Sequence, residues 1–95
     1  MRNYELTFIL QPNLEDEERA DLVDRIQDWV VAVGGQVVKV DHWGKRRLAY
    51  PIRKLKEGFY VLFNLQLPFD GVRELERRLQ ITEQVLRFLT VRVED

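Results

Sequence analysis

The chain has 95 residues, a length that rarely forms two hydrophobic cores, so we expect a single domain over residues 1–95. The hydrophobic share of 45% is enough to form one core. The absence of cysteine excludes disulfides and thiolate metal sites, and one histidine, His42, leaves a poor ligand set, so we expect no metal or other cofactor. No signal-peptide core and no apolar run of about 18 residues are present, so we expect a cytoplasmic protein without membrane association.

The first part of the chain predicts one strand and one long helix. Alternating polar and apolar residues over Asn3–Leu10 indicate a strand, which Gln11-Pro12-Asn13 ends. Glu15–Val33 is predicted as a helix, because its apolar residues recur at helical spacing. Acids fill its first turn, where they face the positive end of the helix dipole, and Gly34-Gly35 supplies a left-handed stop.

The rest of the chain predicts three further strands and a short helix. Gln36–Val40 begins a strand that continues, with a kink near Gly44, to Ile52. Arg53–Gly58 is interpreted as a polar turn, and Phe59–Leu67 as a strand rich in β-branched and aromatic residues. Asp70 is expected to cap a helix that ends near Gln80, and Val85–Val93 is the last predicted strand.

This order of elements predicts an α+β fold of the ferredoxin-like split β-α-β type (βαββαβ), with a four-stranded antiparallel sheet and both helices on one face. The other face is then open. Alternation along the strands places five apolar residues on it: Ile9, Tyr60, Leu62, Leu89 and Val91. This open face is either an ordinary surface with scattered apolar residues or a surface that docks another protein.

Charge is divided unequally along the chain, whose formal net charge is −1. Residues 42–58 hold six of the 15 Lys and Arg residues and one acid, whereas residues 14–33 hold seven acids and two arginines. We call the six cations the basic strip: Lys45, Arg46, Arg47, Arg53, Lys54 and Lys56. Because electrostatics acts over about 8–10 Å at physiological salt, such a strip can hold a polyanion on its own. It predicts contact with RNA phosphates, and a purely solubilising role is the alternative.

Side-chain combinations typical of catalytic sites are nearly absent from the sequence, and we do not expect an enzyme. Without serine or cysteine, Ser-His-Asp and Cys-His arrangements are excluded, and no glycine-rich nucleotide-binding motif is present. An acylphosphatase-like phosphate loop after the first strand is disfavoured, because four acids follow Leu14. Residues 56–63 resemble a degraded RNA-recognition octamer, but Glu57 and Tyr60 depart from its pattern.

Several segments together resemble one family. Gly44–Ile52 (GKRRLAYPI) resembles the signature of the bacterial small-subunit ribosomal protein six family (bS6-type). Arg2–Glu5, Pro12-Asn13-Leu14, Gly58–Tyr60 and Leu67-Pro68 match the same family. The resemblance therefore spans nearly the whole chain.

The resemblance implies a structural constituent of the small (30S) ribosomal subunit that binds the central domain of 16S rRNA together with small-subunit ribosomal protein eighteen. It places Arg46 and Arg47 on the family's arginine pair, whereas the rest of the basic strip and the outlying Arg2 and Arg92 are predicted to bind RNA from their charge. The open face would receive the partner protein, and the free chain is expected to be a monomer. The alternative from another class is a ferredoxin-like protein-interaction or small-ligand-sensing regulatory domain that acts as a dimer.

Overall fold

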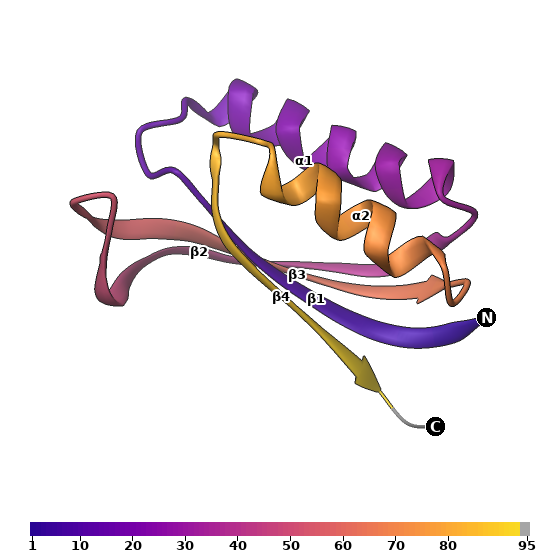
Figure 1. Cartoon of the computed structure of the whole chain (residues 1–95). Coiled ribbons are helices and arrows are strands. Elements are labelled where there is room, and N and C mark those ends of the chain that lie inside the picture. The colour runs from indigo at the N-terminus through magenta and orange to yellow at the C-terminus, as the bar shows by residue number, and fades with distance from the viewer. Residues whose placement is uncertain (94–95) are drawn as a thin grey trace.

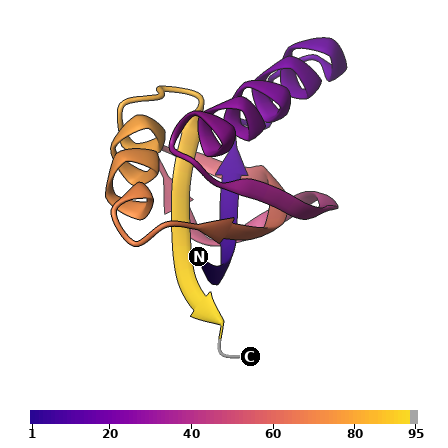
Figure 2. The same cartoon turned by 90° about the vertical axis from the view of Figure 1, so that its right-hand side faces the viewer.

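Six elements follow one another in the predicted order in the computed structural model, which describes residues 1–93. They are β1 (Arg2–Leu10), α1 (Asp16–Ala32), β2 (Gln36–Ile52), β3 (Leu55–Leu67), α2 (Gly71–Gln80) and β4 (Val85–Val93). The strands form an antiparallel sheet in the order β2-β3-β1-β4, and both helices cover one face of it (Figure 1). Turned by 90°, the molecule shows both helices on the same side of the sheet (Figure 2). The ferredoxin-like fold is confirmed.

The hydrophobic core fills the space between the sheet and the helices. Alternate residues of β1 and β3 point into it, and the rings of Phe8 and Phe63 meet edge to face with their centroids 5.0 Å apart. The helices contribute Leu22, Val23, Ile26, Val30, Leu75 and Leu79. Each fully buried Leu or Phe contributes about 1.5–3 kcal/mol relative to an exposed one, so this layer holds the helices on the sheet.

Helix α1 begins and ends where its residues dictate. The backbone N–H of Glu15 donates to the Glu18 carboxylate at 3.3 Å, which satisfies a donor at the helix start. At the other end Gly34 has φ 89°, the left-handed conformation that stops a helix. Neither α1 nor α2 has the length and hydrophobicity that a bilayer crossing requires, and residues 1–93 contain no other helix.

The polar turn predicted over Arg53–Gly58 is wrong in its extent. Only Arg53 and Lys54 lie outside the strands, with φ 51° and 65°, and Ile52 pairs with Leu55 across them. Positive φ at both central residues is typical of the tight hairpin turn whose twist matches that of the flanking strands. Residues 55–58 are therefore part of β3, because a charged segment of an exposed hairpin pairs through its backbone whatever its side chains are.

A β-bulge interrupts the pairing of β2 with β3 at Trp43. His42 pairs with Val61 and Gly44 with Tyr60, so Trp43 is an extra residue in β2. Gly44 has φ 84°, which a residue with a Cβ atom resists. The kink predicted near Gly44 is therefore confirmed. Beyond the bulge every β2 side chain lies on the opposite side from the one that alternation continued from His42 would give, which offsets an earlier register shift between Val37 and Lys39.

Candidate nucleic-acid interface

The basic strip occupies the part of the β2–β3 hairpin that projects beyond the helices (Figure 1). Three of its cations lie on β2, two form the turn and Lys56 lies near the start of β3; all six are exposed. Within residues 1–93 every ion pair lies on the two helices. None of the six cations is therefore paired with a carboxylate of the described chain, and the hairpin presents uncompensated positive charge.

Neighbouring arginines of the strip face opposite sides of the hairpin. Arg46 pairs with Gly58, and a Cβ atom on Gly58 would point toward Ile9 on the open face, so Arg46 lies on the open side. Arg47 pairs with Glu57 and lies on the helix side. Lys45 shares the helix side with Arg47, and its ammonium lies 5.3 Å from the Phe59 ring centroid. The cations thus surround the hairpin and do not form one flat patch.

Two aromatic rings and one guanidinium adjoin each other on the open side of the hairpin. The rings of Trp43 and Tyr60 lie nearly parallel, 11° apart, with centroids separated by 6.4 Å. The Arg46 guanidinium carbon lies 5.3 Å from the Trp43 ring centroid, and its Nε donates to the Trp43 carbonyl oxygen at 3.4 Å. We call this group the Arg46–Trp43–Tyr60 stack. Sequence reasoning missed it, although the aromatic residues among the cations were a signal.

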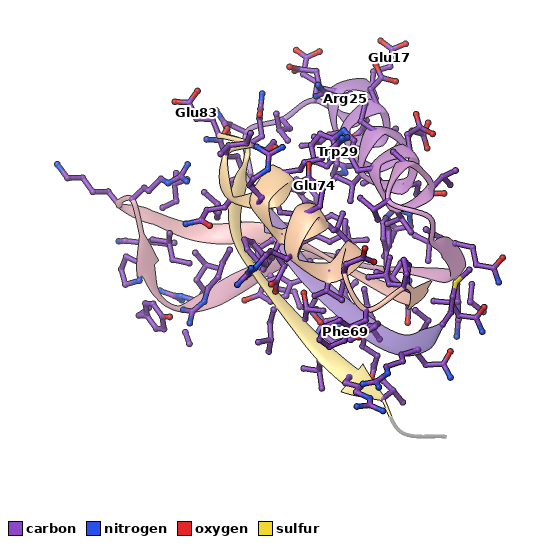
Figure 3. The ribbon with its side chains drawn as sticks, turned by 45° about the vertical axis from the view of Figure 1, so that its right-hand side comes forward. Glu17, Arg25, Trp29, Phe69, Glu74 and Glu83 are labelled. Carbon is purple, nitrogen blue, oxygen red and sulfur yellow. The ribbon has the colours of Figure 1, made fainter. Side chains whose placement is uncertain are left out.

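The tip of the hairpin is tied to the segment between α2 and β4. Arg53 Nη1 donates a hydrogen bond to the Glu83 carbonyl oxygen at 2.7 Å, so this nitrogen already has a partner within the protein. Glu83 lies on the connection at the hairpin end of the molecule (Figure 3). Arg87 of β4 places its guanidinium carbon 5.3 Å from the Tyr50 ring centroid. These contacts fix the direction in which the strip is presented.

Arg2 and Arg92 lie far from the hairpin. Arg2 pairs with Leu67 at the end of β3, and Arg92 pairs with Tyr4, so both are at the opposite end of the sheet from the turn. The Arg2 guanidinium carbon lies 5.7 Å from the ring centroid of Phe69, which is 79% exposed. The structure does not bring these two arginines together with the basic strip.

The open face carries the residues that alternation predicted. Thr7 lies between Leu62 and Leu89, and Glu5 lies opposite Val91, which places all three apolar residues on the side away from the helices. Leu89 and Val91 are 63% and 47% exposed. The expectation that Ile9 is accessible is wrong: it is only 8% exposed, because Leu48 and Leu86 pack over it in a second small cluster.

Helix α1 is acidic. All seven acids predicted for the first helix region are exposed on or next to α1, and Glu17 projects outward from the helix, away from the sheet (Figure 3). On α2, hydrogen bonds from Arg77 and Arg78 lower the pKa of Glu74 from 4.5 to about 2. Within residues 1–93 no three His, Cys, Asp or Glu side chains converge into a metal-binding group. Charge thus separates an acidic helix α1 from a basic hairpin.

Comparison with known proteins gives one consistent family. A sequence model described as ribosomal protein S6 matches residues 3–92. The small ribosomal subunit protein bS6 of Caldanaerobacter subterraneus subsp. tengcongensis is 48% identical over 95 residues, which cover 100% of both chains. The bS6 protein of Clostridioides difficile is 46% identical over 91 residues, covering 96% of this chain and 98% of the relative. The crystal structure of 30S ribosomal protein S6 from Thermotoga maritima superposes with a TM-score of 0.92 at 34% identity, covering 97% of this chain and 87% of that one.

Proposed function

The chain belongs to the ribosomal protein S6 family of the small ribosomal subunit, and on this premise we propose that it binds the central domain of 16S rRNA together with small-subunit ribosomal protein eighteen. Members of this family are components of the bacterial ribosome in the cytoplasm, and the family is a structural rather than an enzymatic one. The proposal therefore concerns which surfaces of this chain meet RNA and protein.

The observation that carries the RNA contact is the exposed, unpaired positive charge of the hairpin. Lys and Arg that are not neutralised internally release counterions from RNA phosphates when they bind. Arg46 and Arg47 lie at the middle of the strip, and arginine adds a planar fork that fits phosphate oxygens. Arg53, Lys54 and Lys56 extend the strip along the hairpin, whereas Arg2 and Arg92 would serve only an RNA segment that reaches the far end of the sheet.

The protein contact belongs to the aliphatic part of the open face. Leu62, Leu89 and Val91 form an apolar surface next to the Arg46–Trp43–Tyr60 stack, and Tyr60 borders both. Ile9 is not available to a partner, because Leu48 and Leu86 cover it. A partner seated there would lie on the same side of the sheet as Arg46, so RNA and protein would meet along one continuous interface.

The test is the salt dependence of RNA binding. The double substitution Arg46→Ala/Arg47→Ala is expected to weaken binding of a 16S central-domain fragment in the presence of ribosomal protein eighteen. The slope of log affinity against log salt should fall by about one for each phosphate that the variant no longer neutralises. Arg77, exposed on α2 but paired with Glu74, offers a control: Arg77→Ala removes a cation without changing affinity or slope. Unchanged binding by the double variant at several salt concentrations would refute the proposal.

We also propose that the free chain is a monomer. The sheet exposes its apolar face, but the basic strips of two copies would repel each other across it. Sedimentation velocity over a range of protein concentrations gives the oligomeric state directly. A stable dimer whose affinity responds to a small metabolite would favour the ligand-sensing alternative instead.

A further inference from the structure

Trp43 is exposed although it is large and aromatic. Trp43 is 41% exposed. It is also the extra residue of the β-bulge, so the hydrogen-bonded ladder between β2 and β3 does not require it. A tryptophan that served only to cover Tyr60 could lie flat against the sheet and be buried. The bulge instead places it on the open side, beside Arg46 of the basic strip.

The ring is held in a defined position. It lies parallel to Tyr60 on one side, Gly44 fixes the backbone after it with φ 84°, and Arg46 contacts both its ring and its carbonyl oxygen. A binding group that is ordered before its ligand arrives loses little conformational entropy on binding. The stack therefore holds an ordered aromatic ring, 41% exposed, with a positive charge 5.3 Å from its centroid.

On the basis of the proposed RNA contact, we propose that Trp43 stacks on one unpaired nucleobase of RNA while Arg46 holds an adjacent phosphate. A nucleotide offers an aromatic face and a negative charge a few ångströms apart, which matches the arrangement of the ring and the guanidinium. In a regular RNA duplex the faces of the bases are covered by their neighbours. Only a bulged, looped or terminal base can offer its face to a side chain on a strand.

The experiment compares two RNA hairpins that are identical except for one unpaired adenosine in the stem of the first. Wild-type protein is expected to bind the bulged hairpin more tightly than the regular one. Trp43→Leu keeps the apolar bulk but removes the aromatic face, so it should lower affinity for the bulged hairpin about 5- to 150-fold. Affinity for the regular hairpin and the salt slope should stay unchanged, because no charge is removed.

Two further variants make the result specific. Trp43→Phe keeps a smaller aromatic face and should retain part of the preference. Phe69→Leu is the matched control, because Phe69 is also exposed beside an arginine but lies at the far end of the sheet; it should leave the preference intact. In Trp29→Phe protein Trp43 is the single tryptophan, and its fluorescence should be quenched by the bulged hairpin but not by the regular one.

The outcomes separate this inference from the proposed function. If Arg46→Ala/Arg47→Ala weakens binding but Trp43→Leu keeps the full preference for the bulged hairpin, the stacking inference fails and the phosphate contact stands. If Trp43→Leu abolishes pairing with ribosomal protein eighteen and leaves RNA preference unchanged, the ring belongs to the protein interface and the inference is overturned. If neither variant changes RNA binding, both proposals fail together.

Discussion

Gly58 of β3 lies close to the backbone of β1 and to the side chain of Ile9. It is buried, and a Cβ atom there would collide with Ile9 Cγ2 and lie 3.1 Å from the carbonyl oxygen of Leu10. Gly58→Ala is expected to lower the free energy of unfolding by about 1–3 kcal/mol, as overpacking of a filled site does. Urea unfolding measures the change. The neighbouring Glu57→Ala, on the exposed side of the same strand, should change stability by less than about 0.5 kcal/mol.

Arg46 and Arg47 are adjacent in sequence but should contribute unequally to RNA binding. Arg46 lies on the open side and contacts Trp43, whereas Arg47 lies on the side of the acidic α1. The Trp43 contact orders the Arg46 side chain before RNA arrives, and immobilising a long side chain costs about 0.5–1.5 kcal/mol, so Arg46→Ala should cost about two- to twelvefold more affinity than Arg47→Ala. Titration of each single variant with the same RNA fragment decides the matter, and equal reductions in affinity would contradict the assigned geometry.

The tight turn of the β2–β3 hairpin places two residues with side chains in a conformation that favours glycine. Lys54, at φ 65°, is the simpler one to change, because Arg53 also binds the Glu83 carbonyl. Lys54→Gly is expected to raise the free energy of unfolding by about 0.5–1 kcal/mol, since relief of the left-handed strain outweighs the greater freedom of glycine in the unfolded chain. Lys54→Ala removes the same charge but keeps the Cβ atom. Equal stability of the two variants would show that the turn is not strained.

Helix α2 carries a carboxylate whose pKa is lowered by two neighbouring arginines. Because Arg77 and Arg78 lower the pKa of Glu74 to about 2 in the folded protein, the carboxylate stabilises the fold above its ordinary pKa of 4.5. This contribution is lost as pH falls from 4.5 to about 2, where the folded form also takes up the proton. Glu74→Gln should therefore be less stable than wild type at neutral pH, with a difference that shrinks through that window. The pair is exposed, so the effect is small.

Thermal unfolding at about pH 6 and about pH 2.5 measures this difference. Glu76→Gln on the same helix is the control, because within residues 1–93 no ion pair involves Glu76. A gap between wild type and Glu74→Gln that persists unchanged at the lower pH would contradict the assignment.

The elements could be predicted from the sequence because their periodicity and their end signals agree. The capped, glycine-ended α1 and the alternating β1 differ from the prediction by a residue or two at their ends. The charged start of β3 could not be predicted, since strand pairing there depends on backbone twist rather than on side-chain pattern. The two register shifts in β2 could not be predicted either: the shift between Val37 and Lys39 and the bulge at Trp43 together decide that Arg46, and not Arg47, shares a side with Leu89.

At the scale of the whole molecule, function depends on which layer each charge occupies. Acids cover α1, and the cations of the hairpin lie at one end of the sheet. A polyanion is therefore repelled from α1 and guided to the hairpin and the open face. Composition alone shows a net charge of −1 and hides this separation, which appears only when the residues are assigned to layers. The apolar surface of the open face lies beside the Arg46–Trp43–Tyr60 stack. A protein and an RNA can therefore bind next to each other there without competing for the same residues.

Shared use of one face predicts that RNA and ribosomal protein eighteen bind cooperatively. RNA and partner bound side by side on this face would contact each other, and a coupling free energy of about 1–3 kcal/mol corresponds to at least about fivefold tighter RNA binding with the partner present. Leu89→Glu places a charge in the middle of the apolar surface, where Leu89 is 63% exposed and adds little to folding stability. The variant should fold normally, lose the partner and lose the enhancement, but keep the RNA affinity of the free protein.

Linkage makes this prediction testable from both directions, because RNA must tighten partner binding by the same factor as the partner tightens RNA binding. Titrations of wild type and Leu89→Glu with RNA, with and without the partner, give the first factor, and titrations with the partner, with and without RNA, give the second. Val31→Glu makes the same change at an exposed residue of the helix layer, so both factors should match those of wild type. Full cooperativity in Leu89→Glu would place the partner elsewhere, on the helices or on the free edge of β2, and would separate the protein contact from the open face altogether.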